Sequence, residues 1–191
     1  NNDLQYPDDN CPDGKLTGNN KPLRGQKGEV FEGGTRVATL ASWPGRLKPG
    51  KFTGVAHISD WMPTLCALAG YLPEKDLKWD GKNLWPQLTG AEPVKPRVIY
   101  TAAPGFSAQA LRDGDWKLIV PKNAAKKSAK TQPGAAGLYD LANDPYETKN
   151  LAAAMPGRVD ELRAKLTQTS QADRDAVAND WSGIFLPKNA P

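Results

Sequence analysis

The sequence is poor in the side chains that most often bind transition metals or act as nucleophiles. Among 191 residues it has one histidine, His57, and two cysteines, Cys11 and Cys66. Two cysteines allow at most one disulfide, which excludes a disulfide-stapled scaffold. These three residues give no zinc-ligand spacing, and no nucleophile motif accompanies His57 as a Ser-His-Asp enzyme would require. We therefore expect no metal ligand set in this chain, and we interpret His57 as a packed histidine with a backbone partner.

The sequence also lacks an apolar run of 18 residues, so it predicts no membrane span. The sequence does not begin with Met, and its first ten residues are polar, unlike a charged-then-apolar leader. We interpret this as a mature or cleaved N-terminus. A secretory origin stays open. The net charge is +4, and basic residues cluster only at 122–130, without aromatic residues between them. Nucleic-acid binding needs a basic face with stacking groups, so we expect none and interpret 122–130 as a solvated loop.

Apolar residues make up only 39% of the chain, while glycine and proline number 18 and 17. This composition is typical of a globular but loop-rich chain. Part of its surface is expected to contact another segment or chain. The length suits one large domain or one and a half average ones. Residues 1–28 contain many Asn, Asp, Gly and Pro residues, which predicts an extended loop.

The first half of the chain predicts one strand and one helix. Residues 36–43, RVATLASW, are predicted to form a buried strand. Residues 57–70 predict a helix that Ser59 or Asp60 caps and that Gly70 ends in the left-handed conformation. One face of this helix is expected to pack against a core through Trp61, Leu65, Leu68 and Ala69.

The second half predicts an antiparallel sheet of about four strands with a helix laid on it, an α+β arrangement. The strands are expected at 97–102, 107–113, 116–120 and 137–141. Asp113-Gly114-Asp115 is typical of a tight hairpin. A helix is predicted from Pro156, with an apolar face made by Val159, Leu162 and Leu166.

The stretch CPDGKLTG, residues 11–18, contains a cysteine that could be taken for a nucleophile. The neighbouring Asp8, Asp9 and Asp13 would raise the pKa of the Cys11 thiol, and no helix is predicted directly after it. The three aspartates could hold a hard cation, but the spacing of a calcium loop is absent. We interpret this region as a solvated acidic loop.

Residues 24–36, RGQKGEVFEGGTR, place Arg24, Lys27 and Arg36 among four glycines. Glycine allows the backbone to approach a ligand closely, and a nearby Lys or Arg suits a tetrahedral anion such as sulfate or phosphate. A glycine-rich turn with solvated charges would give the same pattern, so the residues by themselves leave both interpretations open.

Five segments follow one another in an order that resembles the type I sulfatases, especially the arylsulfatase B-like group. They are GNNKPLRGQKGEVFEGGTRVATLASWPG at 18–45, HISDWMPTLCALAG at 57–70, WDGKNLWPQLTG at 79–90, ALRDGDWKLIV at 110–120 and LYDLANDPYETKNLA at 138–152. The resemblance implies the C-terminal part of an alkaline phosphatase-like α/β fold. Residues 1–96 would end the large α/β domain and carry an active-site loop, and residues 97–191 would form a small α+β domain with a four-stranded antiparallel sheet and a packed helix.

The resemblance also implies one active-site residue in this chain. Lys27 matches the family lysine that contacts the substrate sulfate, and we expect it to be both catalytic and substrate-binding. Glu32, Gly33, Gly34 and Arg36 match the motif that follows. We expect these four residues to be the scaffold that fixes the lysine, with Arg36 paired inside the fold.

The nucleophile and the metal are expected elsewhere. In the family, the cysteine of a Cys-x-Pro-x-Arg motif is oxidised to formylglycine, whose hydrate attacks sulfur. Around Cys11, Pro12 comes one position early and Lys15 stands in place of Arg, so we do not expect Cys11 to be this nucleophile. The family's calcium ligands and its two active-site histidines would also lie outside this chain.

We therefore expect an incomplete sulfuric ester hydrolase. An N-terminal portion of the same sulfatase would be its partner and would supply formylglycine and the calcium ion. The substrate would be a sulfated small molecule or sugar, and the location secreted, periplasmic or lysosomal. Two alternatives stay open: a phosphate or phosphonate monoester hydrolase of the same superfamily, because Lys27 does not distinguish two tetrahedral anions, and a non-catalytic module that binds anionic sugars through residues 121–131.

Overall fold

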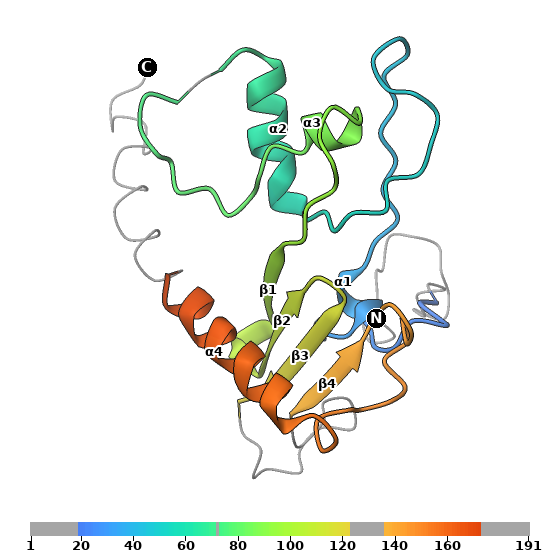
Figure 1. The fold of residues 1–191 in the computed structure, drawn as a ribbon, viewed down its shortest axis with the longest axis vertical. Helices are drawn as coiled ribbons and strands as arrows, with labels where there is room; N and C mark the ends of the chain where they lie inside the picture. Colours follow the sequence, from blue (N-terminus) through green and yellow to red (C-terminus); the bar gives the residue numbers. More distant parts are fainter. Residues whose placement is uncertain (1–18, 72, 123–135, 173–191) are drawn as a thin grey trace, which may run out of the picture. The chain divides into compact units, whose positions relative to one another are not determined.

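A computed structural model of the chain describes residues 19–71, 73–122 and 136–172 (Figure 1). Contacts divide the chain into two compact units. The first combines residues 1–38 with 100–166, and the second combines 39–99 with 167–191. The segment that carries Lys27 thus belongs to the same unit as most of the sheet. The expected boundary at residues 96 and 97 concerns the large domain of the family and stays a prediction.

The sheet has four strands in the order β1-β2-β3-β4 (Figure 1). They are β1 Val98–Ala102, β2 Ala108–Asp113, β3 Trp116–Pro121 and β4 Gly137–Asp140. The pairs β2–β3 and β3–β4 are antiparallel. Asp113 pairs with Trp116, so Gly114 and Asp115 alone form the hairpin loop, and the φ of 61° at Gly114 suits a tight hairpin. The predicted strands and hairpin are confirmed.

Helix α4, Pro156–Ala172, packs on one face of the sheet through residues up to Leu166. Its buried side chains are the three predicted ones, Val159, Leu162 and Leu166, and they meet Leu111, Leu118 and Leu138 of three adjacent strands. Successive strand residues point to opposite faces. Ile119 therefore faces the other way, into a second core cluster that includes Val30 and Phe31. The segment before the short helix α1, Glu32–Thr35, thus packs against that opposite face.

The second unit contains a 3₁₀ turn at Ile58–Asp60, helix α2 at Trp61–Leu68 and helix α3 at Trp85–Leu88. Asp60 is 1% exposed, forms an ion pair with Arg97, and accepts the Lys82 backbone N–H through Oδ1 at 2.9 Å. The Thr64 hydroxyl accepts the Leu84 N–H at 2.9 Å. Gly70 has a φ of 76°, which confirms the predicted left-handed helix end. In the first unit, a separate 3₁₀ turn at Pro104–Phe106 joins β1 to β2.

Three local predictions are wrong: the strand at 36–43, the buried side of α2 and the capping of that helix. Residues 36–43 form no strand, and the side chains of Val37 and Leu40 are 77% and 92% exposed. A strand requires a neighbour for its backbone hydrogen bonds, and none of the described strands pairs with this segment. The buried side of α2 is made by Pro63 and Thr64, whereas Leu65 is 57% exposed.

The capping of the helix also differs from the prediction, which assigned it to Ser59 or Asp60. His57 takes this position: its ring Nδ1 accepts the Ser59 N–H at 3.4 Å, while the Asp60 carboxylate accepts the His57 N–H at 2.6 Å. Asp60 caps no N–H of α2 itself, because its carboxylate binds Arg97 and accepts the N–H groups of His57 and Lys82.

Candidate active-site turn around Lys27

Lys27 lies at the tip of a β-turn. The Gln26 carbonyl accepts the Glu29 N–H at 3.0 Å, which places Lys27 and Gly28 at the two central positions. Gly28 has a φ of 91°, a conformation that favours glycine. The Lys27 side chain is exposed, and within the described part of the chain it has no hydrogen bond or ion pair. The turn therefore presents an ammonium group that is available to an anion.

The two glycines of α1 allow the turn to lie directly against this short helix. A Cβ at Gly33 would lie 2.4 Å from the Gly25 carbonyl oxygen, and a Cβ at Gly34 would lie 2.2 Å from that of Glu29. Atoms cannot approach so closely, so no larger residue fits either position without a backbone shift. The Gly33 N–H also donates to the Arg24 carbonyl at 2.6 Å, which ties the start of the turn to the helix.

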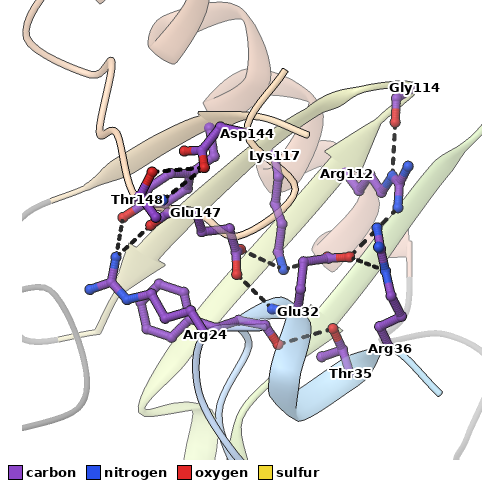
Figure 2. Close-up of polar contacts among 12 residues, drawn as sticks. Arg24, Glu32, Thr35, Arg36, Arg112, Gly114, Lys117, Asp144, Glu147 and Thr148 are labelled. Atoms are coloured by element: carbon purple, nitrogen blue, oxygen red, sulfur yellow. Dashed lines mark hydrogen bonds and ion pairs between the residues drawn. The ribbon is translucent and has the colours of Figure 1, made fainter. Parts of the chain in front are cut away.

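A buried charge cluster made of Glu32, Lys117 and Glu147 links α1 to β3 (Figure 2). The Lys117 ammonium is 2.9 Å from Glu32 Oε1 and 2.9 Å from Glu147 Oε1. All three residues are at most 4% exposed. Glu147 Oε2 also accepts the backbone N–H of Glu32 at 2.7 Å. One strand lysine thus holds two carboxylates that come from segments more than 100 residues apart.

Arginines surround this cluster and compensate its charge. The Arg36 Nε lies 2.8 Å from Glu32 Oε2, and an Arg112 nitrogen lies 3.9 Å from the same oxygen. Arg24 stacks over the Phe31 ring at 4.1 Å and donates to the Glu147 carbonyl oxygen at 2.9 Å. The guanidinium groups of Arg24 and Arg36 are therefore directed to protein partners, as Figure 2 shows.

The two carboxylates of the cluster differ in their acidity. Burial acts to raise the pKa of Glu32, but Lys117, Arg36 and Arg112 outweigh it and lower that pKa. Burial dominates at Glu147 and raises its pKa, because Lys117 and the Glu32 N–H offset the loss of water only in part. Lys117 therefore contacts one carboxylate whose pKa is lowered and one whose pKa is raised.

Glu147 is presented by a tight turn that begins at Asp144. The Asp144 carboxylate accepts the N–H groups of Thr148 and Lys149 and the Thr148 hydroxyl, at 2.8–3.0 Å. Burial acts to raise the pKa of Asp144, but these hydrogen bonds outweigh it and lower the pKa. Glu147 itself has a φ of 56°, an uncommon conformation for a residue with a side chain. The surrounding hydrogen bonds hold it there.

The comparisons with known proteins point to one family, although no family model matches the chain. Arylsulfatase A of Homo sapiens is 33% identical over 162 residues, which cover 76% of this chain and 32% of the relative. Choline-sulfatase of Rhizobium meliloti (strain 1021) is 34% identical over 158 residues, which cover 81% of this chain and 28% of the relative. In sequence, this chain resembles the sulfatases over about three quarters or more of its length.

The fold agrees with this assignment. A solved sulfatase structure, from work on the metabolism of multiple glycosaminoglycans by Bacteroides thetaiotaomicron, matches with a TM-score of 0.67 at 27% identity. The match covers 78% of this chain and 32% of that one. The four-stranded antiparallel sheet and the final helix fit the small domain expected for the C-terminal part of a sulfatase. The chain spans about a third of the length of the curated relatives that it matches.

Residues 24–36 contain the predicted site residues, and the structure gives these residues different surroundings. Lys27 is exposed, and the predicted scaffold residues Glu32, Gly33 and Gly34 lie directly beneath its turn. Arg36 pairs with Glu32, although its side chain is 42% exposed. Arg24 and Arg36 contact protein groups, so the three-cation anion site suggested by residues 24–36 does not form in the described structure.

Sequence reasoning missed Lys117 and Glu147. A lysine inside the apolar strand sequence WKLIV is the one signal that could have indicated a buried charge, since lysine is almost never fully buried without a partner. Nothing local in residues 144–148 identifies Glu147 as that partner. Their ion pair joins positions 30 residues apart and is evident only once β3 and the Asp144 turn are placed together.

The described residues do not supply a metal site. They contain no group of three or more His, Cys, Asp or Glu side chains arranged to hold an ion, so they do not fit the calcium ion that the resemblance implies. His57 contacts the Ser59 hydroxyl at 2.8 Å and is half-buried. Cys11, the three neighbouring aspartates and most of the basic run at 122–130 lie outside the described residues. Among the helices that the structure describes, none is both long and apolar enough to cross a bilayer.

Proposed function

We propose that the complete enzyme hydrolyses sulfate esters and that Lys27 contacts the sulfate group of the substrate. The similarity to named sulfatases supports the reaction class. The observation that carries the role of Lys27 is its exposed ammonium without a protein partner in the described part of the chain, at the tip of a turn that is packed on α1.

The chemistry available to Lys27 is electrostatic. The sulfate oxygens carry negative charge as the ester bond breaks, and an ammonium held near them stabilises that charge without any reorganisation. Glu32, Gly33, Gly34 and Arg36 act as the scaffold for the turn. We infer that the formylglycine nucleophile and the calcium ion belong to parts of the enzyme outside this chain. We also infer that the enzyme is secreted, periplasmic or lysosomal, as the resemblance implies.

The test is replacement of Lys27 in the complete enzyme. We expect Lys27→Ala to lower kcat/KM for an aryl sulfate by about a hundredfold to a thousandfold, the usual cost of removing one such donor. Lys27→Arg keeps the positive charge and should retain part of the activity. The matched control is Lys21→Ala, another exposed lysine on the same segment, which should leave kcat/KM unchanged. Wild-type activity in the Lys27→Ala variant would refute the role of Lys27.

The same assay decides between sulfate and phosphate. A tetrahedral phosphate monoester carries oxygens that an ammonium binds equally well, so the two esters have to be compared directly. We expect the wild-type enzyme to hydrolyse the aryl sulfate with a higher kcat/KM than the matching aryl phosphate. The opposite preference would assign the enzyme to the phosphate or phosphonate hydrolases of the superfamily.

A further inference from the structure

We propose that Glu147 is a positioning residue for Lys27: it holds both ends of the active-site turn and thereby sets where the lysine ammonium points. This inference rests on the role of Lys27 proposed above. Glu147 comes from the turn after β4 and does not itself reach the exposed surface, since it is 0% exposed. Its effect on the reaction therefore has to pass through the groups that it contacts.

Two hydrogen bonds connect Glu147 to the ends of the turn. Its side-chain Oε2 accepts the N–H of Glu32, the first residue of α1, at 2.7 Å. Its backbone carbonyl accepts an Arg24 guanidinium N–H at 2.9 Å. Arg24 precedes Lys27 by three positions, and Glu32 follows it by five. One residue thus anchors the chain at Arg24 and at Glu32 (Figure 2), before and after Lys27 in the sequence.

The two anchored ends also fix the position of Lys27, because the backbone of the turn is packed tightly against α1. The Gly33 N–H donates to the Arg24 carbonyl at 2.6 Å, so the first anchor is also bonded to α1. The backbone carbonyls of Gln26 and Glu29 both lie within 2.5 Å of where a Cβ of Gly34 would be. If α1 moves, the residues on both sides of Lys27 have to move with it.

Lys117 contacts the carboxylate oxygen of Glu147 that does not bond to Glu32. The ammonium lies 2.9 Å from Glu147 Oε1, but the contact has ion-pair rather than hydrogen-bond geometry. The charge of Glu147 therefore matters mainly for stability, and its Oε2 acceptor matters for the position of α1. A glutamine, which keeps an acceptor oxygen but loses the charge, separates these two contributions.

The experiment is a double-mutant cycle in the complete enzyme with an aryl sulfate as substrate. We expect Glu147→Ala to lower kcat by about tenfold to a hundredfold, since misplacing a catalytic group by about 1 Å can cost a hundredfold. In the Lys27→Ala background the same substitution should have no further effect, because the group it positions is already gone. Glu147→Gln should retain activity within about threefold of wild type, although its thermal midpoint falls. Glu161→Gln, on the exposed side of α4, is the control and should match wild type.

The outcomes separate the two proposals. If Lys27→Ala alone has wild-type activity, the proposed function of Lys27 fails, and the role of Glu147 fails with it. If Lys27→Ala is impaired but Glu147→Ala lowers activity by the same factor in both backgrounds, Glu147 is merely structural and only this inference is overturned. A loss of activity in Glu147→Gln as large as that in Glu147→Ala would also overturn it.

A milder variant covers the case in which Glu147→Ala does not fold. Thr148→Ala removes one exposed hydrogen bond, the 2.9 Å bond to Asp144, from the turn that presents Glu147. We expect a loss of a few fold in kcat that disappears in the Lys27→Ala background, as for neighbouring coupled residues. An unchanged kcat, or a loss that persists in that background, would overturn the inference.

Discussion

At the scale of single residues, the closest packing in the candidate site is between two backbone segments. Gly34 stands where any side chain would meet the carbonyl oxygens of Glu29 and Gln26, at 2.2 and 2.5 Å. Backbone atoms yield less readily than the end of a flexible side chain. The absence of a Cβ at Gly34 is therefore what lets the Lys27 turn lie against α1.

We predict that Gly34→Ala displaces this turn. The added methyl group should cost about 1–3 kcal/mol of stability, as overpacking does, and should lower kcat/KM of the complete enzyme for a sulfate ester. The control is Gly50→Ala, where the nearest atom to a new Cβ is 4.0 Å away. Steady-state kinetics and urea unfolding of both variants check this, and wild-type behaviour of Gly34→Ala would contradict the close packing.

The residue scale also shows how much of the site could be predicted. Lys27 and the Glu-Gly-Gly-x-Arg residues were identified from sequence because they are contiguous and match a family motif. Lys117 and Glu147 were not identified from sequence, because each forms its ion pair with a residue from a distant part of the chain. The competition between burial and ion pairing that places them is a tertiary effect, which spacing along the sequence does not contain.

At the scale of elements, the sheet and α4 were predictable because each has a simple period and local end signals. The Asp113-Gly114-Asp115 hairpin fixes the β2–β3 register, and α4 has apolar residues at helical spacing. Helix α2 was predicted to exist, but its buried side was not. The prediction followed the apolar residues, whereas the helix is anchored by a polar group, Asp60, and by Thr64.

The anchor at Asp60 makes a pH prediction possible. Burial acts to raise the pKa of Asp60, but Arg97 and the N–H groups of His57 and Lys82 outweigh it and lower that pKa. Because the pKa is lower in the folded than in the unfolded state, the carboxylate stabilises the fold above its unfolded pKa of about 3.9. This contribution is lost as the pH falls through the folded pKa.

We therefore expect Asp60→Asn to destabilise the protein by about 3–5 kcal/mol near pH 7, because it leaves the buried Arg97 without a counter-charge. The difference from wild type should shrink as the pH falls below about 4. Glu92→Gln removes one partner of an exposed ion pair with Lys95 and should cost less than about 1 kcal/mol. Urea unfolding of the three proteins at several pH values measures this, and a pH-independent difference for Asp60→Asn would contradict the ion-pair account.

At the scale of the whole molecule, the chain corresponds to about a third of its curated relatives. The segment at 36–43 is informative here. Its apolar pattern predicts a buried strand, yet Val37 and Leu40 are exposed and no described strand pairs with it. A sequence pattern records the environment for which a segment is suited, and that environment includes neighbours that need not belong to the same 191 residues.

The most direct test of the central claim is a crystal structure of the complete enzyme with inorganic sulfate or a sulfated substrate analogue bound. We predict that the Lys27 ammonium lies within hydrogen-bonding distance of a sulfate oxygen, about 2.7–3.2 Å, with the turn still packed on Gly33 and Gly34. A bound sulfate in the active site with the Lys27 ammonium well outside contact distance would contradict the account.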